Sequence, residues 1–394
     1  MTVTIAAVIP TRNRPNLAMS AVRSLLDQDV PIDIFVSDNS SSPDSALRDL
    51  EHSDARVHYL RPPRELRMAE NWDWAVRQAM ARSDATHVTV HYDRKISKPR
   101  QLHALQSAVE AWPDLVITFP VDFVYGYPPP LRLWQVPWTG KGYLIKTSRV
   151  AELTAAGRAS DLGQAFPILS NCLVPRDVLR AVIDRFGDLC NSTSPDTCFT
   201  YRFCTLYSRY LHLDRPLGIL YASDRSNGLG YLRSTGGDFA DFQKVWGDRA
   251  WLDAAPLPGV NLGFNMLYHE YELVRRAAPG ELPPIDRAAC LNQLAEGLRW
   301  LVNPEEKTRL RRLLEEQGWR GETPEFVPPT PQHAVREAIV RFLADHFGRV
   351  PDTITGFAFR NDEEALRYAR KYPRRVQESH EHLDVLDPVP AGAA

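Results

Sequence analysis

The chain has 394 residues, 44% of them apolar, which is enough for two or more domains with buried cores. Its 47 basic and 49 acidic residues leave a formal net charge of −2, so no strong field favours nucleic acid or an anionic membrane as a partner. No run of about 18 apolar residues occurs, so no membrane span is expected. The five cysteines are odd in number and fit poorly with a disulfide framework, and the apolar start lacks a basic segment. We therefore expect a soluble, cytoplasmic protein whose chain begins with a strand.

Strand-like and helix-like segments alternate over the first 120 residues. After a first strand within residues 1–9, apolar spacing predicts strands at residues 32–37, 57–60, 86–90 and 115–119. Helical spacing on one face predicts helices at residues 15–26, 43–51, 68–80 and 101–112. This rhythm predicts an α/β fold with a mostly parallel sheet and helices on both faces.

The alternation breaks near residue 121. Residues 123–142 are rich in proline, glycine and aromatic side chains, and we expect an irregular loop there. Helices are then predicted near residue 150 and at 176–186 and 196–207, with strand-like runs at 172–174, 210–213 and 217–221. From residue 236 onward the pattern is helical, at residues 265–276, 286–301, 304–317, 333–346 and 363–372.

Two polar loops follow the first two strands. The first loop is Pro10-Thr11-Arg12-Asn13-Arg14, and the second contains Asp38-Asn39-Ser40. In a strand–helix–strand unit, both loops lie at the carboxyl edge of the sheet, which is where open α/β sheets bind ligands. Cations suit a diphosphate, and an aspartate with neighbouring amides and hydroxyls suits a ribose or a base edge.

These two loops resemble the opening of family 2 glycosyltransferases of the GT-A fold. That opening reads strand, Pro-Thr-x-Asn-Arg, helix, strand, Asp-Asn/Asp-Gly/Ser-Ser, and the resemblance covers roughly residues 3–230. It implies a GT-A nucleotide-sugar-binding domain at residues 1–235, with a nucleotide-binding half at 1–120 and an acceptor half at 121–235. Residues 236–394 would then form a helical C-terminal region with a frayed tail.

The resemblance also places residues 64–71 close to the nucleotide. Arg67 is the candidate to reach the diphosphate or the base. Asn71 is a second candidate for the donor site, although tying this loop to the sheet edge is the simpler role for it. Trp72 falls at helical spacing and is expected to lie in the core.

At the third family motif the sequence departs from the usual pattern. The fourth strand runs into His91-Tyr92-Asp93-Arg94-Lys95, so the usual Asp-x-Asp is reduced to Asp93 alone. One alternative is a divalent cation, Mg²⁺ or Mn²⁺, held by Asp93 and the donor phosphates, with His91 as a weak further ligand. The other is that Arg94 and Lys95, or the cations of the first loop, take the place of the metal.

Ser194-Pro195-Asp196 resembles the position at which one branch of the family carries its acidic residue. By that resemblance Asp196 is the general base that takes the proton of the acceptor. The same residues also form an ordinary helix start, with proline and an acid in the first turn. His269 and Glu270 are neighbours on a predicted helix, but one such pair does not make a metal site.

The most direct interpretation is a glycosyltransferase that moves a sugar from a nucleoside diphosphate donor to an unidentified acceptor. A single base without a covalent nucleophile predicts direct displacement with inversion at the anomeric carbon. Two alternatives stay open: a nucleotidyltransferase, whose first loop is usually rich in glycine, and a non-catalytic nucleotide-sugar-binding or scaffold protein of the same fold. The sequence specifies neither the sugar nor the oligomeric state.

Overall fold

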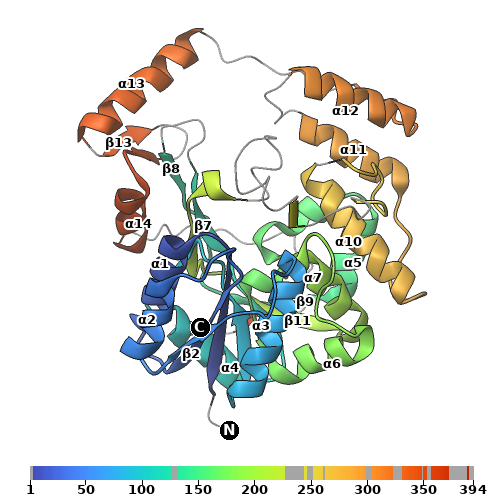
Figure 1. Ribbon diagram of the computed structural model, residues 1–394. Coiled ribbons are helices and arrows are strands. Elements are labelled where there is room, and N and C mark those ends of the chain that lie inside the picture. The colour runs from blue at the N-terminus through green and yellow to red at the C-terminus, as the bar shows by residue number, and fades with distance from the viewer. Residues whose placement is uncertain are drawn as a thin grey trace.

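The structure is a computed structural model, described here for the greater part of the chain. The described residues are 3–125, 131–226, 244–245, 252–260, 262–298, 304–322, 331–347, 349–352, 356–371 and 388–389. Figure 1 shows a central sheet flanked by helices, with the helices of the C-terminal region gathered above one edge of it.

The main sheet has nine strands in the order β15-β9-β11-β6-β10-β4-β1-β2-β3. The strands β1 (Ile5–Thr11), β2 (Ile32–Asp38), β3 (Val57–Leu60) and β4 (His87–Val90) are parallel neighbours, as predicted. The strand β10 (Cys172–Pro175) runs antiparallel between β4 and β6 (Ile117–Thr118), and β11 (Arg209–Leu213) is again parallel to β6. The carboxyl ends of β1, β2 and β4 therefore lie at one edge.

Alternate residues of β1 enter two different cores, because a parallel strand in this fold is buried on both faces. Ile5, Ala7 and Ile9 pack with α1 (Pro15–Leu26), α2 (Ser45–Ser53) and α4 (Gln101–Ala111). Ala6 and Val8 lie in the opposite core, which also contains side chains of α3 (Met68–Arg82), α5 (Thr147–Ala155), α6 (Arg176–Phe186) and α7 (Pro195–Leu206). The predicted α/β architecture with helices on both faces is thus confirmed.

The aromatic segment at residues 123–142 is not the irregular loop that the sequence suggested. It contributes to the strands β7 (Val121–Tyr125) and β8 (Leu131–Trp134), which pair antiparallel, and ends at β9 (Gly142–Lys146). A second sheet forms in the order β13-β14-β8-β7-β12-β5, with β12 at Gly218–Leu220 and β5 at Lys95–Ser97. Alternating apolar and aromatic residues favour strands, and this preference outweighed the prolines and glycines between them.

The C-terminal region contains the predicted helices α10 (Gly263–Ala277), α11 (Arg287–Gly297), α12 (Pro304–Glu316), α13 (Pro331–Phe347) and α14 (Asp362–Lys371). It is not purely helical, however. The strands β13 (Arg349–Asp352) and β14 (Gly356–Phe359) extend the second sheet from β8, and β15 (Pro388–Val389) pairs with β9. A return of the chain to sheets built more than 200 residues earlier leaves no local signal in the sequence.

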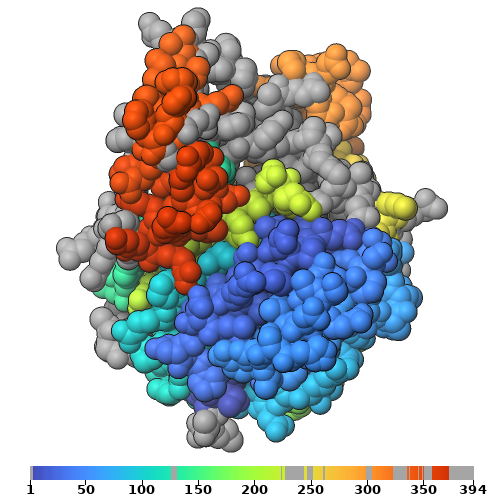
Figure 2. All heavy atoms as spheres, turned by 60° about the vertical axis from the view of Figure 1, so that its left-hand side comes forward, coloured from blue at the N-terminus to red at the C-terminus, as the bar shows by residue number. Residues whose placement is uncertain are grey.

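Parts of the C-terminal region pack directly on the N-terminal domain. In Figure 2 the red surface of α14 lies against the blue N-terminal segment. Ala365 and Ala369 share a core with Leu17 of α1, and Arg370 lies 3.6 Å from the carboxylate of Asp27. The helix α10 packs on α7, where the Tyr201 and Tyr271 rings meet edge to face with centroids 4.9 Å apart. The division at residue 235 remains a prediction, since both sides of it share cores.

Candidate active site

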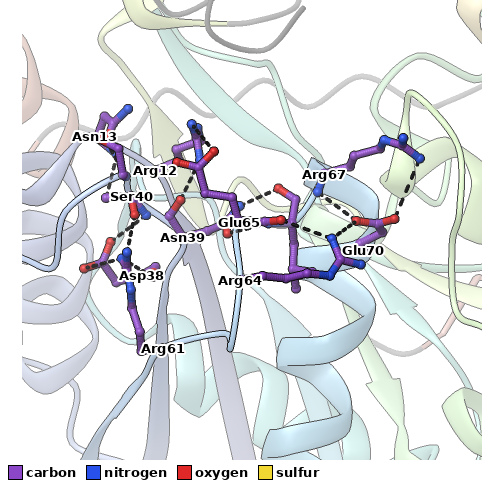
Figure 3. Close-up of polar contacts among 12 residues, drawn as sticks. Arg12, Asn13, Asp38, Asn39, Ser40, Arg61, Arg64, Glu65, Arg67 and Glu70 are labelled. Atoms are coloured by element: carbon purple, nitrogen blue, oxygen red, sulfur yellow. Dashed lines mark hydrogen bonds and ion pairs between the residues drawn. The ribbon is translucent and has the colours of Figure 1, made fainter. Parts of the chain in front are cut away.

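Two loops at the carboxyl ends of β1 and β2 are joined by hydrogen bonds, as Figure 3 shows. The amide of Asn39 donates to the carbonyl of Thr11 at 2.9 Å, and the amide of Asn13 donates to Ser40 Oγ at 2.7 Å. Arg12 Nη1 donates to the carbonyl of Asn39 at 2.8 Å. Asn13 adopts φ of 53°, a left-handed conformation that asparagine tolerates better than most residues. The sequence correctly predicted that these loops lie side by side.

Asp38 lies inside the second loop, and its side chain is 0% exposed. Its carboxylate accepts hydrogen bonds from the amides of Ser40 (3.0 Å) and Asp44 (3.2 Å) and from the Tyr59 hydroxyl (2.7 Å), and Arg61 Nη1 lies 3.5 Å away. Burial opposes ionisation, but these hydrogen bonds together lower the pKa of Asp38. Asp38 thus organises the loop from within, and its predicted contact with a ribose or base stays a prediction.

The residues Asn39 and Asn71 also have internal roles. The Asn39 amide group donates to the carbonyl of Leu66 at 2.7 Å, while its side-chain oxygen accepts from the Leu66 amide at 2.9 Å. Asn71 Oδ1 accepts from Ser37 Oγ of β2 at 2.7 Å. Both asparagines are buried, so they tie the segment at residues 64–71 to the sheet edge and do not face a donor. For Asn71 this is the second of the two predicted roles.

Asp93 connects the loop after β4 to the first loop. Thr11 Oγ1 donates to Asp93 Oδ2 at 2.9 Å, and Arg14 Nη1 lies 3.6 Å from Asp93 Oδ1. Arg94 donates to the carbonyl of Tyr221 at 3.3 Å and to Ser226 Oγ at 3.1 Å. Burial lowers the pKa of Arg94, nearby Asp93 raises it, and nearby Arg14 lowers it, so the three side chains share one electrostatic environment. Arg14 thus pairs with Asp93, and Arg94 lies close enough to both to interact with them electrostatically.

The neighbouring residues His91 and Lys95 do not face this site. His91 is 0% exposed, and its ring nitrogens pair with the carbonyl of Tyr92 (3.0 Å) and with Ser97 Oγ (3.2 Å). Burial, together with the charge of Lys95, holds the pKa of His91 well below its ordinary value. Lys95 is also fully buried and donates to the carbonyl of Ser170, so neither the predicted metal ligand nor the predicted phosphate contact of Lys95 fits the structure.

The residues present do not fit a divalent cation held by the protein. Asp93 is buried, with 4% of the residue exposed. Its carboxylate already accepts a hydrogen bond from Thr11 and forms an ion pair with Arg14. Within the described part of the chain, no group of three or more His, Cys, Asp and Glu side chains could hold a metal ion. A cation held by the protein alone would need more carboxylate or imidazole ligands than this loop provides, whereas a cation held by Asp93 together with the donor phosphates stays a prediction.

Asp196 lies at the start of α7, and its carboxylate faces the same loop. The Tyr92 hydroxyl donates to Asp196 Oδ2 at 2.5 Å. Ser194 Oγ and the amide of Thr197 both donate to Oδ1 at 3.0 Å. Asp196 keeps part of its surface exposed, so a ligand can reach it. One tripeptide, His91-Tyr92-Asp93, therefore contacts both the first loop and the predicted base.

The predicted donor-binding residues divide by accessibility. Those that are buried and bound to other protein groups are Pro10, Thr11, Asp38, Asn39, Ser40, Asn71 and Asp93. Those that keep exposed surface are Arg12, Asn13, Arg14, Arg67 and Arg94. Arg67 is the N-cap residue of α3, and its backbone amide donates a hydrogen bond to Glu70 Oε2 at 3.0 Å. The exposed set is dominated by arginines, which suits a phosphate group.

Sequence reasoning missed several residues that shape the site. Tyr92 was visible only as the middle of a degenerate motif, yet it donates to Asp196. Tyr59 of β3 and Arg61, which follows that strand, contact the carboxylate of Asp38, and Arg225 donates to the carbonyl of Asn13 at 3.4 Å. Short sequence motifs could not have identified these partners, because each one is distant in sequence from the residue that it contacts.

Comparison with known proteins agrees with this geometry. Residues 6–150 match the model of glycosyl transferase family 2. Residues 6–150 are therefore a glycosyl transferase family 2 region of the chain. For this part of the chain the match confirms the predicted family, and with it the GT-A fold and the activity class, which is glycosyl transfer. No match was found among curated proteins.

Solved structures similar to this chain include those of TarS from S. aureus. The crystal structure of TarS 1-349 has a TM-score of 0.45 at 12% identity, covering 91% of this chain and 97% of that one. The same fragment in complex with UDP-GlcNAc has a TM-score of 0.44 at 12% identity, covering 91% and 99%. Against the longer TarS crystal structure the TM-score is 0.43 at 14% identity, and this chain, covered over 80% of its length, spans 52% of that one. No helix in the described residues is long and apolar enough to cross a membrane.

Proposed function

We propose that the protein transfers a sugar from a nucleoside diphosphate donor to an acceptor by direct displacement, with inversion at the anomeric carbon. One observation carries this proposal: Asp93 bonds to Thr11 of the first loop, while the adjacent Tyr92 bonds to Asp196 at 2.5 Å. The donor side and the base side thus meet within two consecutive residues. The match of residues 6–150 to family 2 supports the same reaction class.

In this mechanism Asp196 acts as the general base. Its carboxylate takes the proton of the acceptor as the acceptor atom forms a bond to the anomeric carbon. The bond from that carbon to the diphosphate oxygen breaks, and the electron pair leaves with the diphosphate. Tyr92 and Ser194 hold the carboxylate through opposite oxygens, which fixes its orientation before the acceptor arrives.

The charge that develops on the leaving diphosphate is offset by arginines. Arg14 and Arg94 flank Asp93 and keep exposed surface, so they are the cations best placed to approach a diphosphate. We draw no step through a divalent cation, because Asp93 is the sole carboxylate of this loop and is already compensated by Arg14. Arg12 and Arg67 are further candidates to contact the donor from the neighbouring loops.

The test is donor hydrolysis and transfer by the purified full chain with a panel of nucleotide sugars. Release of the nucleoside diphosphate from at least one donor is expected, and Asp196→Asn should slow it by about 10²- to 10⁴-fold, the usual share of a general base. Asn keeps the size of the side chain but cannot accept the proton. If no donor binds or reacts, the protein is a non-catalytic member of the fold. If Asp196→Asn reacts at the wild-type rate, the base lies elsewhere.

A second arm of the same experiment addresses the metal. Activity should persist in EDTA and fall when Arg94 is replaced by alanine. Loss of activity in EDTA that Mn²⁺ or Mg²⁺ restores would instead assign the charge compensation to a cation bridging Asp93 and the diphosphate.

A cytoplasmic location stays a prediction, supported by five cysteines that are all free thiols.

A further inference from the structure

A buried glutamate of the C-terminal region contacts the turn that precedes Asp196. Glu270 lies on α10 and is 0% exposed. Its Oε1 accepts a hydrogen bond from the amide of Ser194 at 2.9 Å and another from Thr193 Oγ1 at 3.1 Å. These two residues lead directly into the helix that carries Asp196, and nothing in the donor site or in the core requires a carboxyl group at this position.

We infer that Glu270 is a positioning residue for the proposed general base, supplied by the C-terminal region. The connection runs in two steps: Glu270 holds the backbone of Ser194, and Ser194 Oγ donates to Asp196 Oδ1 at 3.0 Å. The opposite oxygen of Asp196 accepts from Tyr92. The carboxylate is therefore held between the N-terminal domain on one side and α10 on the other. This inference rests on the proposed function, because it assigns Asp196 the role of base.

The position of Glu270 is fixed by its neighbours on the same helix. Tyr271 packs edge to face on Tyr201 of α7 and donates to the carbonyl of Pro283 at 2.6 Å. His269 accepts from the amide of Ala254 at 3.2 Å, so it is bonded to a different segment from the one that Glu270 contacts. The two residues do not form a metal-binding pair. α10 is thereby locked against α7, and a displacement of one helix relative to the other would move the turn.

Burial of the Glu270 carboxyl group destabilises its ionised form, so a role for this group in the turn would explain its position. Burial raises the pKa of Glu270 to about 7, although hydrogen bonds from Ser194, Ser192 and Thr193 act in the opposite direction and Asp196 adds to the rise. An apolar side chain of similar size would avoid this cost but would leave the Ser194 amide and the Thr193 hydroxyl without their acceptor. The geometry of the turn is what the carboxyl oxygen secures.

The experiment compares three variants of the full chain. Glu270→Gln keeps the acceptor oxygen and should retain the greater part of kcat for donor turnover. Glu270→Met has similar bulk but no acceptor, and kcat should fall by about 10- to 100-fold, because a displacement of about 1 Å in a reacting group costs a factor of this size. Tyr271→Phe is the matched control: it keeps the ring that packs on Tyr201 of α7 and removes only the hydrogen bond to the carbonyl of Pro283, so it should lower the melting temperature and leave kcat unchanged. Affinity for the nucleoside diphosphate should be unchanged in all three.

A double-mutant cycle separates positioning from general destabilisation. If Glu270 acts through Asp196, adding Glu270→Met to Asp196→Asn should cost no further activity, although each single change is costly. Equal losses of kcat in Glu270→Met and Tyr271→Phe at matched loss of stability, or additive losses in the double variant, would overturn the inference. So would a folded Glu270→Met protein with wild-type kcat. An inactive wild-type protein would count against the proposed function instead, so the two failures are distinguishable.

Discussion

The buried carboxyl group of Glu270 should make stability depend on pH in a way that Glu270→Gln removes. The pKa of Glu270 rises from an ordinary 4.5 to about 7 on folding, chiefly because of burial. Between these two values the folded protein binds more protons than the unfolded chain, so the free energy of unfolding must fall as pH increases. The loss is complete above the folded pKa. Glutamine does not titrate and carries no such loss.

The size of the effect follows from the same pKa change. Each pKa unit corresponds to about 1.4 kcal/mol, so an ionised Glu270 costs up to about 3 kcal/mol relative to the protonated form. Most of this, about 2.5 kcal/mol, should develop between pH 5 and pH 8. The stability of Glu270→Gln relative to wild type should therefore increase by that amount over this range, whatever constant difference the amide group introduces.

The assay is denaturant unfolding of wild type and Glu270→Gln at several pH values between 5 and 8, with Tyr271→Phe as a control. The control keeps Glu270, so its stability relative to wild type should not vary with pH. A Glu270→Gln difference that is flat across the range would show that Glu270 titrates normally, and that the carboxyl group is not held in a buried site. A difference of the opposite sign would show that the ionised form is the one that folding favours.

Three further outcomes are expected. Tyr92→Phe keeps the ring that packs against Trp72 but removes the hydrogen bond to Asp196. The kcat should fall about 10-fold, with donor affinity unchanged in calorimetry. A variant with wild-type kcat would show that Tyr92 has no role in catalysis. Asp38→Ala removes the acceptor of several buried donors, so urea unfolding should show a loss of about 3 kcal/mol; a variant as stable as wild type would contradict the internal role of Asp38. Burial lowers the pKa of Lys95 to about 7, so wild type should gain stability as pH rises from 7 toward 10.5. The stability of Lys95→Met relative to wild type should accordingly fall as pH rises from 7 toward 10.5, and a pH-independent difference would contradict the burial of a charged amine.

Local patterns in the sequence predicted most elements of the fold. The helix from Pro15 to Leu26 and the five C-terminal helices follow from apolar spacing that a single segment carries. The pairing of β14 with β8 does not, because the register joins Ala358 to Arg132 across more than 200 residues. The same reason explains why the segment at residues 123–142 was expected to be a loop. Its strands become evident only when their partners are known.

The candidate site divides in the same way. The sequence placed Thr11, Asp38 and Asp93 at one sheet edge because each follows a parallel strand, and that placement needs only topology. What it could not supply is the direction of each side chain. Asp38 was expected to face a ligand, yet the donors of Tyr59 and Arg61 enclose it. Whether a polar residue serves a ligand or the loop itself depends on partners that are distant in sequence.

The tripeptide His91-Tyr92-Asp93 explains how a degenerate motif can still organise a site. Its three side chains have three separate destinations: His91 enters the core, Tyr92 donates to Asp196, and Asp93 accepts from Thr11. A motif of several carboxylates gathers charge at one point, as a metal requires, whereas this one distributes its contacts between donor and base. In the proposed mechanism, Arg14 and Arg94 supply the positive charge that a metal would bring. With Asp93 as the one acid of this motif, the loop therefore contacts the first loop through Asp93 and the predicted base through Tyr92.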